Sequence, residues 1–153
     1  MPTLFINMPV TDLDRSKAFW EALGFEINPA FTDHNAACVV IEKDHSYAMI
    51  VTREFYQTFT DLPLGDPAKN PTSGTSIFLD SRADVDAAVE RGLAAGGTEA
   101  QPPSDYGFMY QRNVTDPDGN IIDFGWMDPI AAEQGPAAYL ESSGADPHAE
   151  SGD

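Results

Sequence analysis

The same order of predicted elements occurs twice in this chain, and that repetition constrains the fold more than any other feature. A strand over residues 3–10 and a helix over residues 12–23 are followed by three short strands. A strand over residues 74–81 and a helix over residues 83–95 are again followed by three short strands. Each copy is too small to close a core alone, so the copies must pack together. The repetition therefore predicts an α+β fold, in which two βαβββ modules with curved, mostly antiparallel sheets form a cleft.

The two modules are expected to form one domain over residues 1–128. The modules themselves are assigned to residues 1–52 and 74–128. Residues 53–73 link them, and this linker combines one or two helical turns with a stretch rich in proline and glycine. Such a linker could cover a pocket.

Residues 129–153 differ in composition from the rest of the chain. They include five acidic side chains, no lysine or arginine, and few large apolar residues. Because such a segment buries little apolar surface, an acidic and largely disordered tail is predicted. The disorder is expected past about Leu140, and a short helix over residues 131–140 that packs Tyr139 on the body is the alternative before that point.

Capping and turn signals place the ends of several elements. Thr11 is predicted to cap the first helix, and Ser81 the second. Residues 98–102 are predicted to form a short strand of the second module. In "DPDGN", Gly119 can adopt the left-handed conformation that completes a short hairpin.

The charge of the chain narrows the range of partners. Eight basic and 25 acidic residues give a formal net charge of −17. This field repels phosphates and anionic lipids, so neither nucleic acid nor a membrane is expected as a partner. The same field favours solubility and attracts cationic ligands. Because no apolar run approaches the roughly 20 residues of a membrane helix and no basic segment opens the chain, a cytoplasmic protein is expected.

Several stretches resemble one known family. "INMPVTDLDRSKAFWEALGFEI" resembles the opening module of the vicinal oxygen chelate superfamily, and "GG" followed by "DPDGNIIDF" is similar to its closing hairpin. The superfamily includes glyoxalase I, bleomycin-resistance proteins and extradiol dioxygenases. "SDYGFMYQRNVTDPDGNIIDFGWMD" is further similar to bacterial proteins described as lactoylglutathione lyases. The resemblance, over Thr3 to Asp128, implies the fold and a homodimer that completes the cleft, while the fold hosts many chemistries.

The resemblance also implies where a metal ion would lie. Enzymes of the superfamily hold one divalent ion with two ligands from each module, on strand positions that face the cleft. In this chain those positions fall at Phe5, near Ile50, at Thr75 or Ser76, and at Asp123. Asp123 is the only charged residue of this set.

Histidine and cysteine ligands are equally scarce. His34 and His45 lie in predicted turns, His148 lies in the predicted tail, and Cys38 is the only cysteine. Zinc, nickel and iron sites need at least three nitrogen, sulfur or carboxylate ligands at one point. We therefore expect no metal ligands and no cofactor, with a magnesium or calcium site of loop carboxylates as the alternative. A serine or cysteine nucleophile with a histidine partner cannot be assembled either.

Asp123 is the one charged residue in the predicted strand "NIIDFGWM". A buried carboxylate must accept hydrogen bonds, pair with a cation or take up a proton. Three roles stay open, namely an ion pair with Arg112, recognition of a ligand's amine or hydroxyl, and general base catalysis. Gly125 on the same strand face would leave room for a ligand.

Other candidate ligand-binding residues are expected to line the same cleft. They are Phe5, Asn7, Thr52, Tyr110, Arg112 and Trp126. Their aromatic rings attract cations, and their polar groups can orient a ligand. Packing within the core is the alternative for the aromatic and amide side chains.

The leading functional hypothesis is a metal-free, small-molecule-binding protein of the glyoxalase and bleomycin-resistance type, with Asp123 as the polar anchor. The acidity of the chain favours a cationic ligand. One alternative is a lyase or isomerase of the lactoylglutathione lyase type with a different metal arrangement. Another is a metal-independent enzyme in which Asp123 is the general base and Arg112 or Tyr110 stabilises negative charge. An interaction module whose cleft is filled by side chains is the third.

Overall fold

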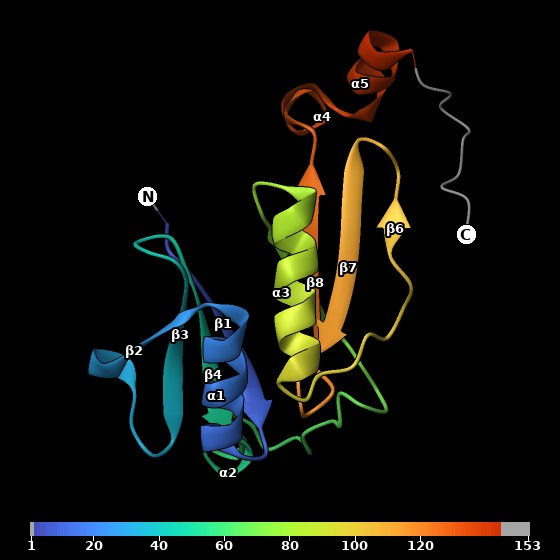
Figure 1. Cartoon of the computed structure of the whole chain (residues 1–153). Helices are drawn as coiled ribbons and strands as arrows, with labels where there is room; N and C mark the ends of the chain where they lie inside the picture. The colour runs from blue at the N-terminus through green and yellow to red at the C-terminus, as the bar shows by residue number, and fades with distance from the viewer. Residues whose placement is uncertain (1, 145–153) are drawn as a thin grey trace.

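Two four-stranded sheets, one from each half of the chain, form the frame of the fold (Figure 1). The structure is a computed structural model that describes residues 2–144. The first module contains β1 (Leu4–Val10), α1 (Leu13–Leu23), β2 (Glu26–Asn28), a 3-10 turn (Pro29–Phe31), β3 (Ala36–Glu42) and β4 (Ser46–Thr52). The second contains β5 (Gly74–Phe78), α3 (Arg82–Ala94), β6 (Ser104–Asp105), β7 (Met109–Thr115) and β8 (Ile121–Met127). The predicted α+β fold of two βαβββ modules is confirmed.

Both sheets share one topology. The strand order is β1-β4-β3-β2 in the first sheet and β5-β8-β7-β6 in the second. The first strand of each module runs parallel to the last, and the other neighbours are antiparallel. This arrangement leaves β1 and β5 as edge strands of their sheets.

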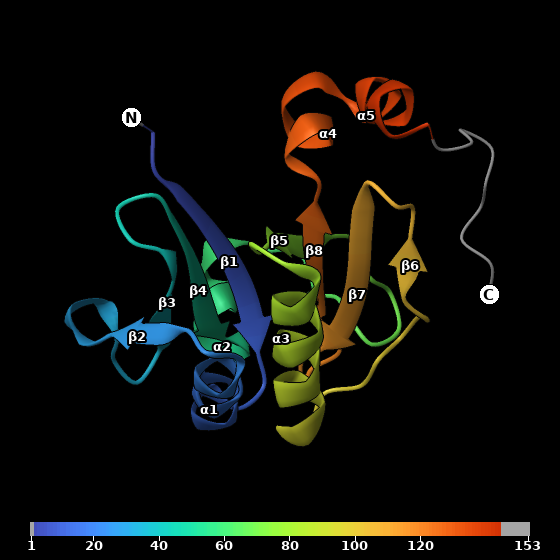
Figure 2. The ribbon, with the colours of Figure 1, turned by 45° about the horizontal axis from the view of Figure 1, so that its top comes forward.

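One hydrophobic cluster contains residues of both modules. Helices α1 and α3 lie side by side, each across a face of its own sheet (Figure 2). Trp20 and Leu23 of α1 are buried, as are Val85 and Val89 of α3. At Gly92 an added Cβ would lie 3.0 Å from Leu23 Cδ2, so the missing side chain lets α3 approach the end of α1. The modules are therefore joined through their helical faces.

The helix caps agree with the sequence at one position and differ at another. Ser81 caps α3 by accepting a hydrogen bond from Asp84 N at 3.0 Å, as predicted. The prediction that Thr11 caps α1 is wrong, because Asp12 accepts from the backbone N of Arg15 at 3.0 Å. A carboxylate at this place also interacts favourably with the helix dipole.

The "DPDG" hairpin turn forms as predicted and also connects the modules. Gly119 has φ 94°, and the buried Asp116 carboxylate accepts from Asp118 N and from both nitrogens of Asn120. Thr11 N in the first module donates to Asp118 Oδ1 at 2.9 Å. The turn therefore has a structural role that accounts for its sequence.

The short strand predicted over residues 98–102 does not form, and β6 takes its place in the sheet. Only Thr98 makes a bridge to β7. The backbone N–H groups of Ala100 and Gln101 donate instead to Asn113 Oδ1, at 2.9 and 3.2 Å. A side chain thus takes the donors that a strand would offer to its neighbour.

The segment after β8 is helical as far as Ser143, and this includes the residues for which a short helix was considered. Helices α4 (Pro129–Gln134) and α5 (Pro136–Ser143) meet at Gly135, whose φ of 93° interrupts the single helix considered as the alternative. The ring of Tyr139 in α5 packs on Phe108, with centroids 6.1 Å apart. These contacts order the segment despite its composition, while predictions for residues 145–153 lie outside the described residues.

The linker begins with α2 (Arg53–Tyr56) and a 3-10 turn (Gln57–Phe59), then continues as an irregular chain. The guanidinium of Arg53 donates to the carbonyls of Gly65 and Leu64, at 3.0 and 3.4 Å. Ala68 lies so close to Gly119 that a Cβ there would be 2.7 Å from Ala68 Cα. The linker is thus held against the second module. None of the helices within residues 2–144 has the length and apolar content needed to cross a bilayer.

Candidate functional site

Each strand alternates between the face that its helix covers and an open face. In the first sheet Phe5 and Asn7 of β1 lie on the open face, with Tyr47 and Met49 opposite them on β4. In the second sheet the open-face residues are Ser76 and Phe78 on β5, Ile121, Asp123 and Gly125 on β8, and Gln111 and Asn113 on β7. Asn7 of one open face and Ile121 of the other line the same cavity, and the space between the two open faces is called the cleft below.

The ends of this cleft differ in character. Tyr47 and Phe5 stack at one end, with ring centroids 4.8 Å apart. At the other end Asn7 and Ile121 line a cavity of about 290 Å³ that linker residues 63–73 help to enclose. The cleft therefore has an aromatic end and an end that the linker covers.

Asp123 is the charged residue between these two ends. It is half-buried, and its Oδ2 accepts a hydrogen bond from Ser76 Oγ at 3.5 Å. Asn113 lies directly opposite it on β7. Burial raises the pKa of the Asp123 carboxyl, and the Ser76 hydroxyl opposes that rise. No basic side chain among residues 2–144 pairs with it, so the carboxylate can accept hydrogen bonds from a ligand.

The predicted ion pair between Arg112 and Asp123 is wrong. The register places Asn113 opposite Asp123, so Arg112 projects to the other face of the sheet. There Arg112 pairs with the carboxylates of Asp86, Glu90 and Glu99, at 3.0, 3.0 and 2.6 Å. The arginine thus joins β7 to α3 and to the segment before β6.

Tyr110 and Trp126 share that helical face and do not approach Asp123. The Tyr110 hydroxyl donates to Asp86 Oδ1 at 2.6 Å, and burial together with this bond raises the pKa of Tyr110 to about 12. The Arg82 guanidinium lies 5.2 Å from the Tyr110 ring centroid and 4.9 Å from that of Trp126. The predicted receptor of three aromatic rings around one carboxylate therefore does not assemble, since Phe5 alone faces the cleft.

Three further expectations about the cleft fail for local reasons. Thr52 caps α2 by accepting from Phe55 N at 3.3 Å, so its hydroxyl serves the helix. Ile50 is fully buried on the helical side of β4. At Gly125 a Cβ would lie 2.9 Å from the Phe78 ring, so this glycine makes room for Phe78 rather than for a ligand.

Sequence reasoning missed Asn113, Phe78 and Tyr47 as cleft residues. A signal for Asn113 was present in the hairpin itself. The turn pairs Thr115 with Ile121, and counting back two residues on each strand places Asn113 against Asp123. Phe78 and Tyr47 have no such local signal, because their position depends on how the modules pack.

The residues of the cleft do not fit a catalytic metal ion of the superfamily type. No three His, Cys, Asp or Glu side chains in the described range come close enough to hold one. On the open faces of β1, β4, β5 and β8 the sole carboxylate is Asp123, and Ser76 is a weak neutral donor. A transition ion requires at least three strong ligands at one point.

The paired modules and the cleft between them define the vicinal oxygen chelate class of fold. The sequence profile of the Glyoxalase/Bleomycin resistance protein/Dioxygenase superfamily matches residues 4–124, and the chain belongs to this superfamily. None of the curated proteins matches the sequence.

Solved structures share the fold at low sequence identity. The hypothetical protein SA1046 from S. aureus is 23% identical, with a TM-score of 0.69, covering 82% of this chain and 94% of that one. A glyoxalase/bleomycin resistance protein from Albidiferax ferrireducens T118 is 25% identical, with a TM-score of 0.62 and coverages of 82% and 98%. TnmS3, an antibiotic binding protein from Streptomyces sp. CB03234, is 21% identical, with a TM-score of 0.61 and coverages of 84% and 97%.

Proposed function

We propose that the protein binds a small organic molecule in the cleft without a metal ion, with Asp123 as the polar anchor. The observation that carries this proposal is the half-buried Asp123 carboxylate, which has one long hydrogen bond and no cationic partner. Leaving such a group unpaired costs free energy unless something else satisfies it. A ligand that donates hydrogen bonds would do so.

The surroundings of Asp123 indicate the chemistry of that ligand. Ser76 and Asn113 flank the carboxylate on the neighbouring strands and can orient a second polar group. Phe5, Tyr47 and Phe78 offer aromatic surface toward one end of the cleft. A flat molecule with a protonated amine fits this combination, and the net charge of −17 attracts it.

A second copy of the chain is proposed to complete the cleft. Phe5 and Phe78 are 51% and 47% exposed although both lie within strands on the open faces. Exposed aromatic rings at such positions favour contact with an apolar surface of a second subunit. Light scattering should therefore report a homodimer, and a monomer at micromolar concentration would contradict this part of the proposal.

The similar solved structures support the binding of a small organic ligand, but not its identity. TnmS3 is described as an antibiotic binding protein, so the same fold serves small-molecule capture in at least one protein. Its 21% identity carries no information about which molecule this chain takes.

Metal-independent proton transfer is the second candidate function. Burial raises the pKa of Asp123, and a carboxylate with a raised pKa is a better general base near neutral pH. In that case Asp123 would remove a proton from a bound substrate. Replacing Asp123 by Asn would then abolish turnover while substrate still binds.

A thermal-shift screen tests the binding proposal. Cationic, neutral and anionic aromatic compounds, including cationic antibiotics and glutathione adducts, are added over a range of concentrations. We expect saturable stabilisation by a cationic compound and an affinity about tenfold lower in Asp123→Asn. The exposed Asp61 of the linker is the matched control, and Asp61→Asn should bind as the original chain does. Equal binding by Asp123→Asn and Asp61→Asn would refute the proposal.

A further inference from the structure

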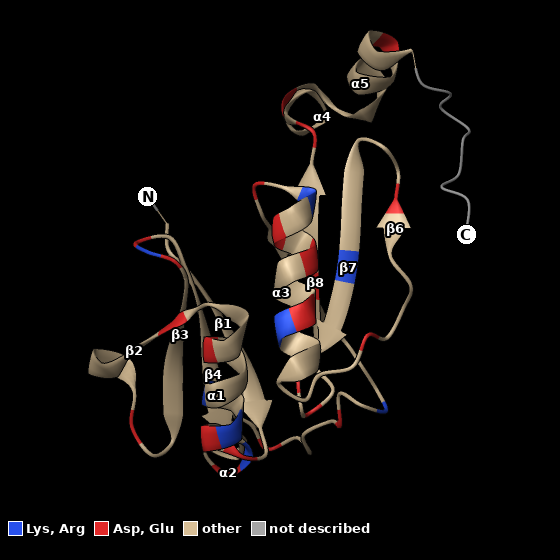
Figure 3. Cartoon of the chain, in the orientation of Figure 1, with Lys and Arg blue, Asp and Glu red and all other residues tan. Residues whose placement is uncertain are grey.

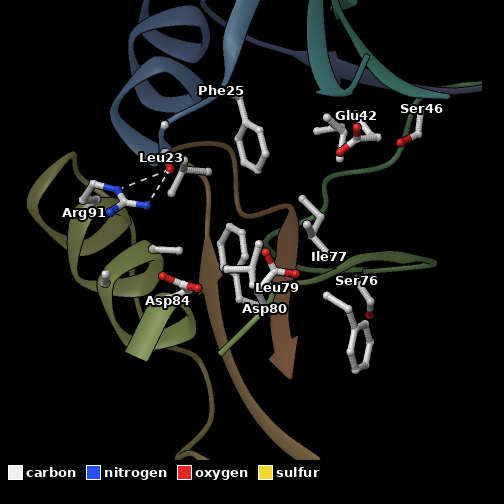
Figure 4. A pocket seen from close by; sticks show the side chains of 16 residues that line it. Leu23, Phe25, Glu42, Ser46, Ser76, Ile77, Leu79, Asp80, Asp84 and Arg91 are labelled. Atoms are coloured by element: carbon white, nitrogen blue, oxygen red, sulfur yellow. Dashed lines mark hydrogen bonds between the residues drawn. The ribbon is translucent and has the colours of Figure 1, made fainter. Parts of the chain in front are cut away.

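A second cavity, of about 610 Å³, opens between the modules near the ends of α1 and β5. It lies at the end of α1 and beside α3, and at the edge strand β5 it meets the open face through Ser76 and Phe78. Figure 4 shows Asp84 and Arg91 projecting from α3 on one side of it, with Glu42 and Ser46 across the cavity. A volume of this size accommodates a small organic molecule.

The floor of this cavity is apolar. Phe25, Ile41 and Leu79 line it and are half-buried, and Phe25 stacks on the buried Phe124 with ring centroids 6.5 Å apart. These side chains come from both modules, so the floor exists only in the assembled domain. It provides a surface on which an aliphatic or aromatic group can rest.

The rim of the cavity is acidic and lacks neutralising partners. Glu42 ends β3, Asp80 follows β5, and Asp84 lies in the first turn of α3. No lysine or arginine within residues 2–144 forms an ion pair with any of the three. Figure 3 marks acidic as well as basic positions along α3, which forms one side of the cavity.

Arg91 is the one basic side chain that lines the cavity, and two of its three guanidinium nitrogens donate to a backbone carbonyl. Its Nε and Nη2 donate to the carbonyl of Leu23, at 3.3 and 3.0 Å. A cation at the C-terminal end of α1 is favoured by the helix dipole. Three carboxylates against one guanidinium leave a formal excess of two negative charges at the cavity.

We propose that this inter-module cavity is a second binding site, for a small organic ammonium ion that carries an apolar body. The apolar body rests on the floor of Phe25, Ile41 and Leu79, and the ammonium group faces the carboxylates of the rim. Ser76 and Phe78 of β5 line this cavity from the open face of the second sheet, and Ser76 also donates to Asp123, but Asp123 does not itself line the cavity. The carboxylates of the rim therefore bind a ligand independently of the Asp123 carboxylate.

A backbone-amide NMR titration with 2-phenylethylammonium chloride tests it. Saturable shifts are expected at Ile77, Asp80, Asp84 and Arg91. Neutral 2-phenylethanol and anionic phenylacetate, which have similar bodies, should bind at least tenfold more weakly. Raising the salt concentration from about 0.05 to about 0.5 M should lower the affinity for the ammonium ion severalfold, because exposed charges are screened.

Two variants and one control variant complete the test. The triple change Glu42→Gln, Asp80→Asn and Asp84→Asn should lower the affinity for the ammonium ion about tenfold or more. Ala87→Phe places a ring in the cavity from an exposed position of α3 and should abolish the shifts. Glu133→Gln on α4 is the matched control for charge and should change nothing.

The outcomes at the two sites can be distinguished. Asp123→Asn should leave the shifts around the cavity unchanged, even if it abolishes binding in the cleft. Shifts confined to Asn113, Ile121 and Asp123 would overturn the second site and support the cleft. Shifts around the cavity that survive the triple change, or that neutral 2-phenylethanol produces equally well, would overturn the charge argument.

Discussion

Replacing Arg112 by Met is the sharpest test of how the candidate site is built. Arg112 is 10% exposed and contacts three carboxylates, of which Glu99 is 22%, Asp86 50% and Glu90 64% exposed. Methionine keeps most of the buried stem but removes the charge and its hydrogen bonds. The three acidic groups would then lie close together without a cation.

The magnitude follows from these exposures. Removing one partner of a fully buried ion pair costs roughly 3–5 kcal/mol, whereas exposed pairs contribute roughly 0–1 kcal/mol. Only the contact with Glu99 is largely shielded from solvent, so we expect a loss of about 2 kcal/mol. For a domain of this size that loss lowers the melting temperature by roughly 4–8 °C.

Urea denaturation followed by circular dichroism at pH 7 measures the loss, and double-mutant cycles assign it. Arg112→Met combined with Glu99→Gln should show a coupling energy above about 1 kcal/mol, because the two side chains touch. Arg112→Met combined with Asp123→Asn should be additive within about 0.5 kcal/mol. A coupling to Asp123 as large as that to Glu99 would refute the reasoning, since it would mean that the two residues share one face of the sheet.

Three further predictions concern groups outside this network. Burial raises the pKa of Asp123 in the folded state, so the contribution of Asp123 to the free energy of unfolding falls as the pH rises above its ordinary pKa of 3.8. In urea denaturation Asp123→Asn should therefore increase the free energy of unfolding more at pH 7 than at pH 4. An added Cβ at Gly97 would lie 2.6 Å from the carbonyl oxygen of Thr115, so Gly97→Ala should cost roughly 3 kcal/mol in the same assay. Gly96→Ala has open space but φ 101° and should cost about 1–2 kcal/mol, and equal losses for the two glycines would contradict the steric argument. Burial also raises the pKa of the Cys38 thiol, so Ellman's reagent should modify it at least a hundredfold more slowly in the native protein than in urea.

The modules and their topology could be predicted because the signals for them are local. A strand or helix is predicted from the periodicity of apolar residues over about ten positions. Ser81 marks the start of a helix and Gly119 marks a turn through residues close to them in the sequence. The segment after Asp128 gave only a weak signal, for one short helix over residues 131–140 that packs Tyr139 on the body. Tyr139 packs on Phe108, while the φ of 93° at Gly135 divides the segment into two helices.

The sequence alone determined that Asp123 is a lone carboxylate in a strand of a two-module fold with too few ligands for a transition ion. It could not determine which groups meet that carboxylate. Strand register decided that Asn113 and Ser76 flank Asp123 while Arg112, Tyr110 and Trp126 face α3. The approach of the two modules then created the cavity beside Phe25 and Phe124. Register and module packing are sums over many distant contacts, so no single stretch of residues encodes them.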